Sequence, residues 1–176
     1  MLFIKFLLAT ASIVFCCCDN SSITKQLTNK ENDSSLSPKF NATFDYIIFG
    51  RFCGECGSNC AVMHRYNPNT KELFADYTDS YFKKDGNIVC KTKVSDSTKI
   101  ILADSICKSI PDFLINNTNL SERFGCPDCT DGCGIYVEFK QSDKTKRFYI
   151  DHHSNELQKE LQTFTILLVN IIDSLK

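Results

Sequence analysis

The sequence predicts an α+β domain in which an antiparallel sheet of about five strands carries a mid-chain helix and a C-terminal helix on one face. Short β-branched and aromatic runs separated by turn residues occur in residues 44–94 and again in residues 134–150, and such runs are typical of strands. Residues 100–110 and 154–176 instead carry apolar side chains at intervals of three and four. This spacing indicates helices with one apolar side, which a sheet can cover.

The composition limits the classes of protein to which the chain can belong. At 176 residues it is long enough for one domain. With 20 basic and 21 acidic residues and no basic block, nothing indicates nucleic acid as a partner. The outlier is cysteine, with 11 residues. In a reducing cytosol so many thiols indicate metal binding, whereas outside it they indicate disulfides, so the compartment decides their chemistry.

The N-terminus indicates an extracytoplasmic location. Residues 1–15 form an apolar run with a single basic side chain, too short for a comfortable membrane span but typical of a signal peptide. Cys16, Cys17 and Cys18 follow, and the chain then turns polar. This order resembles a bacterial lipoprotein signal, in which a cysteine after the apolar run becomes the lipid-bearing N-terminus. We expect a signal peptide over residues 1–17 and lipidation at Cys17 or Cys18; a plain cleaved signal or a short signal anchor is the alternative.

The next segment predicts a flexible tether. Residues 18–43 are rich in Asn, Ser, Thr and Lys and nearly free of apolar side chains. Such a segment cannot bury enough surface to offset the entropy lost on ordering. Roughly 25 residues of flexible chain hold a globular part tens of ångströms from a membrane. Residues 44–176 are then expected to form a single cysteine-rich globular domain.

Two cysteine clusters with the same spacing, C-x2-C-x3-C, organise this domain. Residues 46–49 form a strand-like run before the first cluster, and each cluster is followed by two such runs around a turn, at residues 67–70 and 141–144. Turn residues between strand-like runs predict hairpins, so we interpret the clusters as a pseudo-repeat in which each opens a hairpin. A looser strand is expected at residues 87–94. The clusters consist of Cys53, Cys56 and Cys60 and, each 73 positions later, of Cys126, Cys129 and Cys133.

Two segments have the signals of helix boundaries. The mid-chain helix is expected to end before Pro111, because the residue preceding a proline disfavours the helical conformation. The C-terminal helix is expected to begin with Ser154 as its N-cap and to lie across the sheet. Its apolar stripe consists of Leu157, Leu161, Phe164, Leu168, Ile171 or Ile172, and Leu175.

Disulfides are the first interpretation of the cysteines. The domain holds eight, because Cys90 and Cys107 add two further candidates to the six in the clusters. An even number in an extracytoplasmic domain favours disulfides, although eight cysteines allow 105 connectivities and the sequence does not select one. Each bond that closes a long loop would stabilise the domain by ~2–4 kcal/mol.

Structural zinc is the second interpretation. Cys-x2-Cys turns that open hairpins resemble the knuckles of zinc ribbons, and tetrahedral zinc needs four ligands. Cys53, Cys56, Cys126 and Cys129 would supply them if the two turns meet in space. Against this, the 69-residue gap between the two pairs is long for a ribbon, and an oxidising compartment competes for the thiols.

A thiol-disulfide oxidoreductase is the third interpretation. Catalysis of the thioredoxin type places Cys-x2-Cys at a helix N-terminus, where the dipole lowers the thiol pKa, whereas both pairs here lead into strands. The ferredoxin spacing needed for an iron–sulfur cluster is missing. His64, His152 and His153 are interpreted as ordinary side chains rather than metal ligands. No catalytic residue is predicted, because no Ser-His-Asp pattern, phosphate loop or carboxylate pair stands out.

Four segments carry a resemblance to a group of known proteins. Residues 46–60, residues 125–129 and the runs at 134–138 and 149–151 resemble small uncharacterised lipoproteins of Bacteroidota-type bacteria. No activity is established for such proteins as a group, so the resemblance implies no functional residue. It agrees with an extracytoplasmic protein held by an N-terminal lipid.

The expected function follows from these observations. We expect a cell-envelope protein that is lipid-anchored to a membrane and that acts as a non-enzymatic binding domain rather than as an enzyme. Its protein partner is not identified by the sequence, nucleic acid is not expected as a partner, and no cofactor is expected. A protein that binds zinc through four cysteines, or a thiol-disulfide oxidoreductase, is the alternative.

Overall fold

The structure is a computed structural model that describes residues 43–54, 56–83, 87–119, 121–129, 132–151 and 155–176. The expected signal peptide, the lipidation candidates Cys17 and Cys18 and nearly all of the tether lie outside these ranges. The expected N-cap Ser154 and the neighbouring His152 and His153 lie outside them as well. Among the described residues, no helix is long and apolar enough to cross a membrane.

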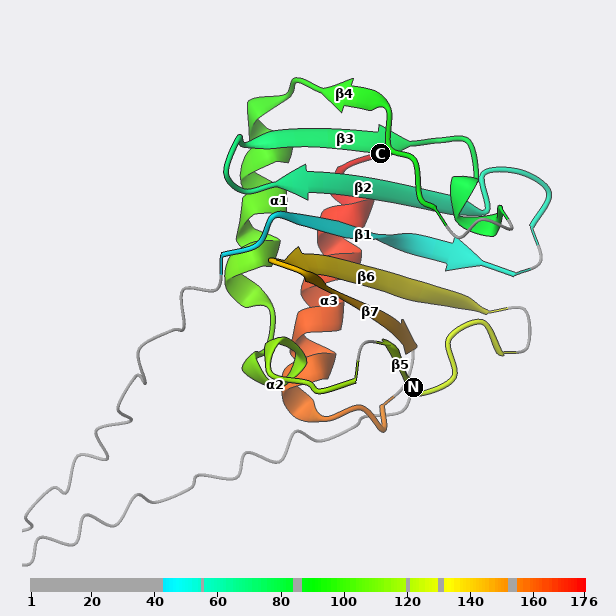
Figure 1. The fold of residues 1–176 in the computed structure, drawn as a ribbon. Coiled ribbons are helices and arrows are strands. Elements are labelled where there is room, and N and C mark those ends of the chain that lie inside the picture. Colours follow the sequence, from blue (N-terminus) through cyan, green and yellow to red (C-terminus); the bar gives the residue numbers. More distant parts are fainter. Residues whose placement is uncertain (1–42, 55, 84–86, 120, 130–131, 152–154) are drawn as a thin grey trace, which may run out of the picture. The chain divides into compact units, whose positions relative to one another are not determined.

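A seven-stranded sheet in the order β4-β3-β2-β1-β6-β7-β5 forms the centre of the domain (Figure 1). All neighbouring strands are antiparallel except β5 and β7, which are parallel. The predicted α+β class is confirmed, but the sheet is mixed and larger than the expected five or so strands. The strands are β1 (Tyr46–Cys53), β2 (Ala61–Asn67), β3 (Glu72–Asp76), β4 (Thr92–Val94), β5 (Ser121–Phe124), β6 (Cys133–Gln141) and β7 (Lys144–Asp151).

Two long helices lie behind the sheet as Figure 1 shows it, both on the same face. Helix α1 (Ser97–Ser109) begins after Asp96, whose carboxylate accepts hydrogen bonds from two backbone N–H groups of the first turn. It ends before Pro111, as expected. Helix α3 (Lys159–Ser174) begins with Gln158 as its N-cap. The prediction of two helices on one face is therefore confirmed. The short elements are helix α2 (Asp112–Ile115) and a single 3-10 turn, η1 (Ser80–Phe82).

The main core lies between the sheet and these helices. It is apolar because alternate residues of the central strands point to this face and meet the apolar sides of α1 and α3. Burying a large apolar side chain stabilises the fold by ~1.5–3 kcal/mol. Core side chains with at most 2% of their surface exposed include Ile47, Phe49, Tyr66, Phe139, Phe148, Ala103, Ile106, Leu161, Phe164 and Leu168.

Strand β1 lies between two equivalent hairpins. The hairpin β2–β3 pairs with one edge of β1, and the hairpin β6–β7 pairs with the other. Residues 73 positions apart lie opposite the same residue of β1, so the pseudo-repeat of the sequence has a counterpart in the sheet. The matched positions are Ile47 with Tyr66 and Phe139, Ile48 with Arg65 and Glu138, Phe49 with His64 and Val137, Gly50 with Met63 and Tyr136, and Phe52 with Ala61 and Gly134.

Candidate functional site

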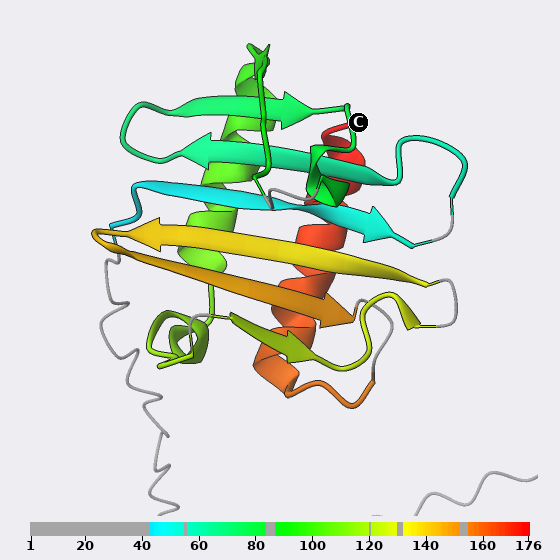
Figure 2. The same ribbon diagram turned by 45° about the vertical axis from the view of Figure 1, so that its right-hand side comes forward.

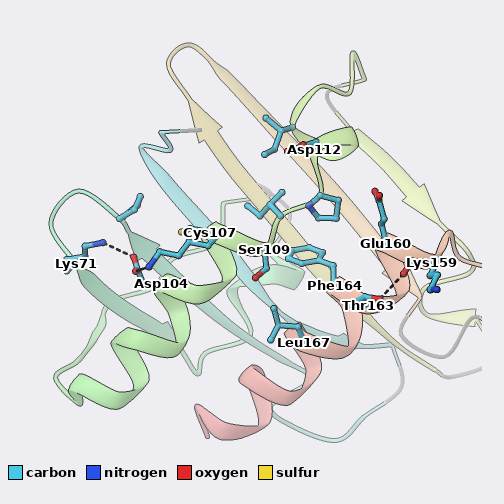
Figure 3. Close-up of a pocket in the computed structure, with 15 residues that line it drawn as sticks. Lys71, Asp104, Cys107, Ser109, Asp112, Lys159, Glu160, Thr163, Phe164 and Leu167 are labelled. Carbon is cyan, nitrogen blue, oxygen red and sulfur yellow. Dashed lines mark hydrogen bonds and ion pairs between the residues drawn. The ribbon is translucent and has the colours of Figure 1, made fainter. Parts of the chain in front are cut away.

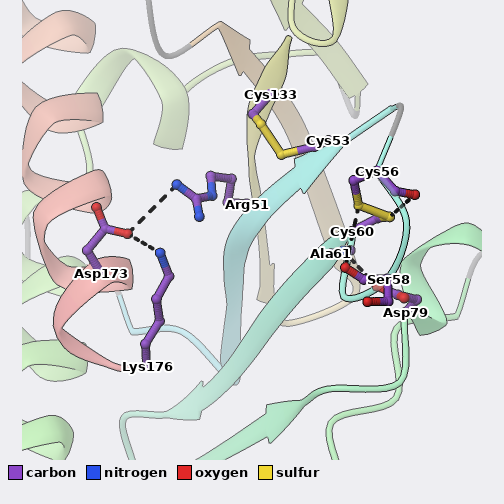
Figure 4. Close-up of a disulfide and its surroundings, with 10 residues drawn as sticks. All are labelled: Arg51, Cys53, Cys56, Ser58, Cys60, Ala61, Asp79, Cys133, Asp173 and Lys176. Atoms are coloured by element: carbon purple, nitrogen blue, oxygen red, sulfur yellow. Dashed lines mark hydrogen bonds and ion pairs between the residues drawn. A yellow bond between two sulfur atoms is a disulfide. The ribbon is translucent and has the colours of Figure 1, made fainter. Parts of the chain in front are cut away.

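All six cluster cysteines form disulfides at one end of the sheet, here called the disulfide corner. Figure 4 shows two of the three bonds, Cys53–Cys133 and Cys56–Cys60. Cys53 at the end of β1 bonds to Cys133 at the start of β6, with the two Cα atoms 4.1 Å apart and 80 positions between them in sequence. The other two bonds are local. They join Cys56 to Cys60, four positions apart, and Cys126 to Cys129, three positions apart.

The two clusters touch each other directly. Gly54 lies against Asp128, so that a Cβ atom on Gly54 would be 2.4 Å from the Asp128 Oδ1 atom. Gly134 is enclosed in the same way, because its Cβ would be 2.5 Å from the Phe52 ring and 2.7 Å from the Pro127 Cβ. All three distances are shorter than a normal contact of a Cβ atom. The two clusters therefore form one packed unit that is cross-linked by the long-range disulfide.

This pairing bears on the zinc and redox interpretations. The four cysteines of the expected zinc set are all bonded to sulfur, and no group of three or more His, Cys, Asp or Glu in the described ranges is placed to hold a metal ion. The two Cys-x2-Cys turns lead to β2 and β6 rather than to a helix. In this arrangement no helix dipole activates either turn.

The two remaining cysteines of the domain are free thiols. Cys90 packs against the side of the sheet opposite the helices, where its Sγ lies 3.7 Å from the carbonyl oxygen of Met63. Cys107 belongs to α1 and packs against the main core. They lie on opposite faces of the sheet and so do not form the further disulfide that the sequence suggested. Burial raises the pKa of both thiols to about 12, which makes them weak nucleophiles at neutral pH.

A groove lies on the helix side, between α1, α2 and α3 (Figure 3). Its volume is about 1040 Å³, and Cys107, Ile110, Phe164 and Leu167 contribute apolar lining. The charged residues of its lining are Lys71, Asp104, Lys108, Asp112, Lys159 and Glu160.

The charged groups at the α1 end of this groove are paired with one another. Asp104 accepts hydrogen bonds from Lys71 at 2.7 Å, Lys108 at 2.8 Å and the Tyr66 hydroxyl at 2.8 Å. The hydrogen bonds from Lys108 and Lys71 hold the pKa of Asp104 well below its usual range. Thr163 donates to the Lys159 carbonyl within the same helix. Asp104 and its two lysine partners therefore do not need a ligand at this end of the groove.

Among the described residues, no α-helix covers the second face of the sheet (Figure 2). Near the disulfide corner, η1 and the segment around it pack on this open face, where the Tyr81 ring stacks on Phe52 at 4.7 Å and meets Tyr136 edge-on at 5.6 Å. Farther along the strands, arginine and tyrosine side chains make up much of the face that the structure describes. We call this region the Arg–Tyr face; it comprises Tyr46, Arg65, Arg123, Tyr136, Glu138, Arg147 and Tyr149.

Glu138 is the centre of the Arg–Tyr face. Its residue is only 6% exposed, and its carboxylate accepts hydrogen bonds from the Tyr46 hydroxyl at 2.9 Å, the Tyr136 hydroxyl at 2.6 Å and the Arg147 Nε at 2.7 Å. Burial raises the pKa of Tyr46 and Tyr136, and the charge of Glu138 adds to this rise. Both phenols therefore stay protonated and remain donors at neutral pH.

Two exposed arginines lie over tyrosine rings of this face. The Arg65 guanidinium carbon is 4.6 Å from the centre of the Tyr46 ring, and that of Arg123 is 4.9 Å from the centre of the Tyr149 ring. Such contacts contribute ~0.5–1 kcal/mol at exposed sites. The ring holds the flat guanidinium in place while its N–H edges stay accessible, which is the geometry that binds carboxylates through two parallel hydrogen bonds.

Sequence reasoning did not select the residues of the Arg–Tyr face as a site. The alternation in residues 134–139 does assign Tyr136 and Glu138 to the side away from the core. The 73-residue offset also relates Arg65 to Glu138, and both lie opposite Ile48. These two signals together assign Arg65, Tyr136 and Glu138 to one face of the sheet. The hydrogen bonds and ring contacts on that face depend on which strands are neighbours, which the signals do not give.

No family model matches the chain, and neither a curated protein sequence nor a solved structure does. Fold and site therefore define only a class: a disulfide-bonded α+β domain with one helix-covered and one open sheet face. The resemblance to small Bacteroidota-type lipoproteins stays a prediction.

Proposed function

We propose that the protein is a lipid-anchored, extracytoplasmic binding protein without enzymatic activity, and that the Arg–Tyr face is its binding surface. The observation that supports this most is the open side of the sheet, where arginines and tyrosines are held in place around the buried Glu138. Tyr and Arg are enriched in protein interfaces and supply much of the binding energy there. Rings and guanidinium groups that are already fixed lose little entropy when a partner binds.

The extracytoplasmic location is supported by the cysteines and the N-terminus. Three disulfides are expected to form and persist in an oxidising compartment, not in a reducing cytosol. The apolar run followed by Cys17 and Cys18 fits a lipoprotein signal. A polar tether of about 25 residues would leave the domain free to present its open face to a partner at the membrane.

The state of the polar groups favours binding over catalysis. Glu138 is occupied by three donors and so is a poor general base. The two free thiols have raised pKa values, unlike nucleophilic cysteines, whose pKa is lowered.

Photo-crosslinking in intact cells tests the binding surface. A benzophenone amino acid would replace Ser121, which is exposed and lies beside Arg147 on this face. The matched control places it at Asn170, which is exposed on α3 on the other side of the sheet. We expect a discrete cross-linked product from position 121 and none from position 170. Equal products from both positions, or none from position 121 in the cells that produce the protein, would overturn the proposal.

Labelling with a radioactive fatty acid tests the anchor separately. We expect the wild-type chain to incorporate label and to sediment with membranes, and the variant Cys17→Ser/Cys18→Ser to lose both properties. An unlabelled wild-type chain would contradict the lipid anchor. The proposed binding surface would still be decided by the cross-linking experiment.

A further inference from the structure

The three arginines of the Arg–Tyr face form a row across the sheet, in which Arg123 is offset by two residues along the strand direction. Arg65 of β2 and Arg147 of β7 belong to the same row, with Ile48 and Glu138 between them. Neighbouring strands are about 4.8 Å apart, so the backbones of these two arginines are about 14 Å apart. Arg123 of β5 pairs with Tyr149, two residues beyond Arg147, which places it about 8 Å farther on. The row therefore spans about 20 Å of the sheet.

Each of these arginines is held by another side chain. Arg65 and Arg123 lie over tyrosine rings. Arg147 donates its Nε hydrogen to Glu138, and this hydrogen bond raises its pKa. The contacts orient the guanidinium groups without enclosing them, because Arg65, Arg123 and Arg147 are all exposed. A partner that binds here does not have to order three long side chains.

The three positive charges of this row are not all paired. Arg147 pairs with Glu138; on the same face, Glu72 pairs with Lys93, and Asp76 accepts hydrogen bonds from Thr78 and Ser80. Arg65 and Arg123 take part in no ion pair within the part of the chain that the structure describes. The face therefore favours an anionic partner.

The same side of the molecule indicates which kind of anion fits. The guanidinium groups of Arg65 and Arg123 cover the rings of Tyr46 and Tyr149, so these rings are not available to stack on a sugar. Beyond them, the segment around η1 exposes the apolar side chains Tyr77, Phe82 and Val89. Arginines next to exposed aromatic side chains are typical of surfaces that bind proteins.

We propose that the Arg–Tyr face binds a protein that presents a patch of Asp and Glu carboxylates, which Arg65, Arg147 and Arg123 contact with their free N–H edges. This inference rests on the proposed function, because it names the partner of the same surface. The guanidinium fork matches a carboxylate in shape as well as in charge.

Binding of the full chain to fluorescent poly-L-glutamate, followed by anisotropy at physiological ionic strength, tests this proposal. We expect saturable binding that weakens about tenfold in Arg65→Glu and in Arg123→Glu, since each reverses one charge of the row. The matched control Lys159→Glu makes the same charge change on α3, on the opposite side, and should stay within about twofold of wild type. Circular dichroism confirms that each variant is folded.

Two further measurements decide between the alternatives. Arg65→Lys keeps the positive charge but removes the paired N–H donors of the guanidinium group, and we expect binding about threefold to fivefold weaker than wild type. Unchanged binding would contradict recognition of carboxylates through two parallel hydrogen bonds. Vesicles of phosphatidylglycerol and phosphatidylcholine offer phosphates in place of carboxylates. Tighter binding to these vesicles than to poly-L-glutamate, lost in Arg65→Glu, would overturn the proposal in favour of a lipid surface.

The remaining outcomes separate this inference from the proposed function. If Lys159→Glu weakens binding as much as Arg65→Glu does, the interaction is with net charge and the inference fails. If poly-L-glutamate does not bind but position 121 still cross-links to a partner in cells, the Arg–Tyr face is supported as the binding surface and the proposal that it recognises carboxylates is contradicted. If neither experiment gives a signal, both proposals fail together.

Discussion

The two cysteine clusters have the same spacing but are used differently. In the first cluster, the second and third cysteines, Cys56 and Cys60, bond to each other. In the second cluster, the first and second cysteines bond to each other, and the third, Cys133, reaches across to Cys53. Equal spacing in the sequence therefore does not give equal connectivity in the structure.

The neighbouring strands explain the difference. The first cluster joins β1 to β2, which are adjacent, and the Cys53 N–H donates to the Cys60 carbonyl across that pair. The second cluster joins β5 to β6, which are separated by β7. Cys60 and Cys133 thus flank Cys53 from the two sides, and only Cys133 bonds to it. Spacing predicts that bonds form, whereas sheet order decides which cysteines share them.

The largest expected effect distinguishes the long-range bond from a local one. Cys53→Ser/Cys133→Ser opens a loop of 80 residues, and the loss of chain-entropy stabilisation is about 4 kcal/mol. Cys56→Ser/Cys60→Ser opens a loop of four, for which the same argument gives about 2 kcal/mol. Urea unfolding of both double variants measures the difference. Equal losses would mean that loop length does not control the stabilisation. The two clusters would then differ in connectivity but not in their contribution to the free energy of unfolding.

The second effect concerns a pair of matched residues, His64 and Val137, which both lie opposite Phe49. The His64 ring is fully buried and stacks on Phe49 at 5.6 Å, and neither ring nitrogen has a hydrogen-bond partner among the described residues. Burial, with a smaller contribution from the positive charge of Lys99, lowers the pKa of His64 to about 4. The folded state therefore holds this ring neutral where the unfolded chain would protonate it.

Stability should fall with acid because of this histidine. Above the unfolded pKa of 6.5 neither state is protonated. Between that pH and about 4, only the unfolded chain takes up the proton, so the free energy of unfolding falls, by up to about 3 kcal/mol in total. Asp76 and Asp104, whose pKa values are lowered from 3.8, contribute mainly below this window. His64→Val, which copies Val137, should flatten the dependence between pH 6.5 and 5, and an unchanged slope would assign the loss to other groups.

The third effect concerns Gly134, whose counterpart in the first half is Ala61. Gly134→Ala would bring a Cβ to 2.5 Å from the Phe52 ring and 2.7 Å from Pro127, and such overpacking costs about 2 kcal/mol. Gly57→Ala is the control, because its Cβ would meet nothing within 4 Å. Thermal unfolding compares the two variants. If Gly134→Ala is as stable as wild type, the second cluster does not pack against β1 as closely as described.

The smallest effect concerns the contact between the clusters. Gly54→Ala would press against the carboxylate of Asp128. That side chain is exposed and can turn away, so we expect a loss below about 1 kcal/mol. The double variant Gly54→Ala/Asp128→Ala should restore wild-type stability. A large loss in the single variant that persists in the double variant would show that the strain is in the backbone instead.

Local signals predicted most of the fold. Proline and the three-and-four spacing located α1, and turn residues located both hairpins. Strand β5 was missed because Ser121–Phe124 is only four residues long and lacks apolar alternation. It joins the sheet through backbone pairing with β7, and no side-chain pattern records such pairing. The mixed character of the sheet was missed for the same reason.

The candidate site was less predictable than the fold. The cysteines were identified as disulfide candidates, but their partners depend on contacts between residues as many as 80 positions apart. The Arg–Tyr face was missed because arginine at a solvent-facing strand position is ordinary. It becomes a candidate site only when Arg65 is seen beside Tyr46, and Arg147 beside Glu138, on neighbouring strands.

The position of Cys53 also bears on how the chain becomes oxidised. Short loops close faster than long ones, so the Cys56–Cys60 and Cys126–Cys129 bonds can close before the sheet forms. Cys133 comes within reach of Cys53 only after the second hairpin has docked beside β1. The long-range disulfide should therefore be the last of the three to close, and it marks a completed sheet.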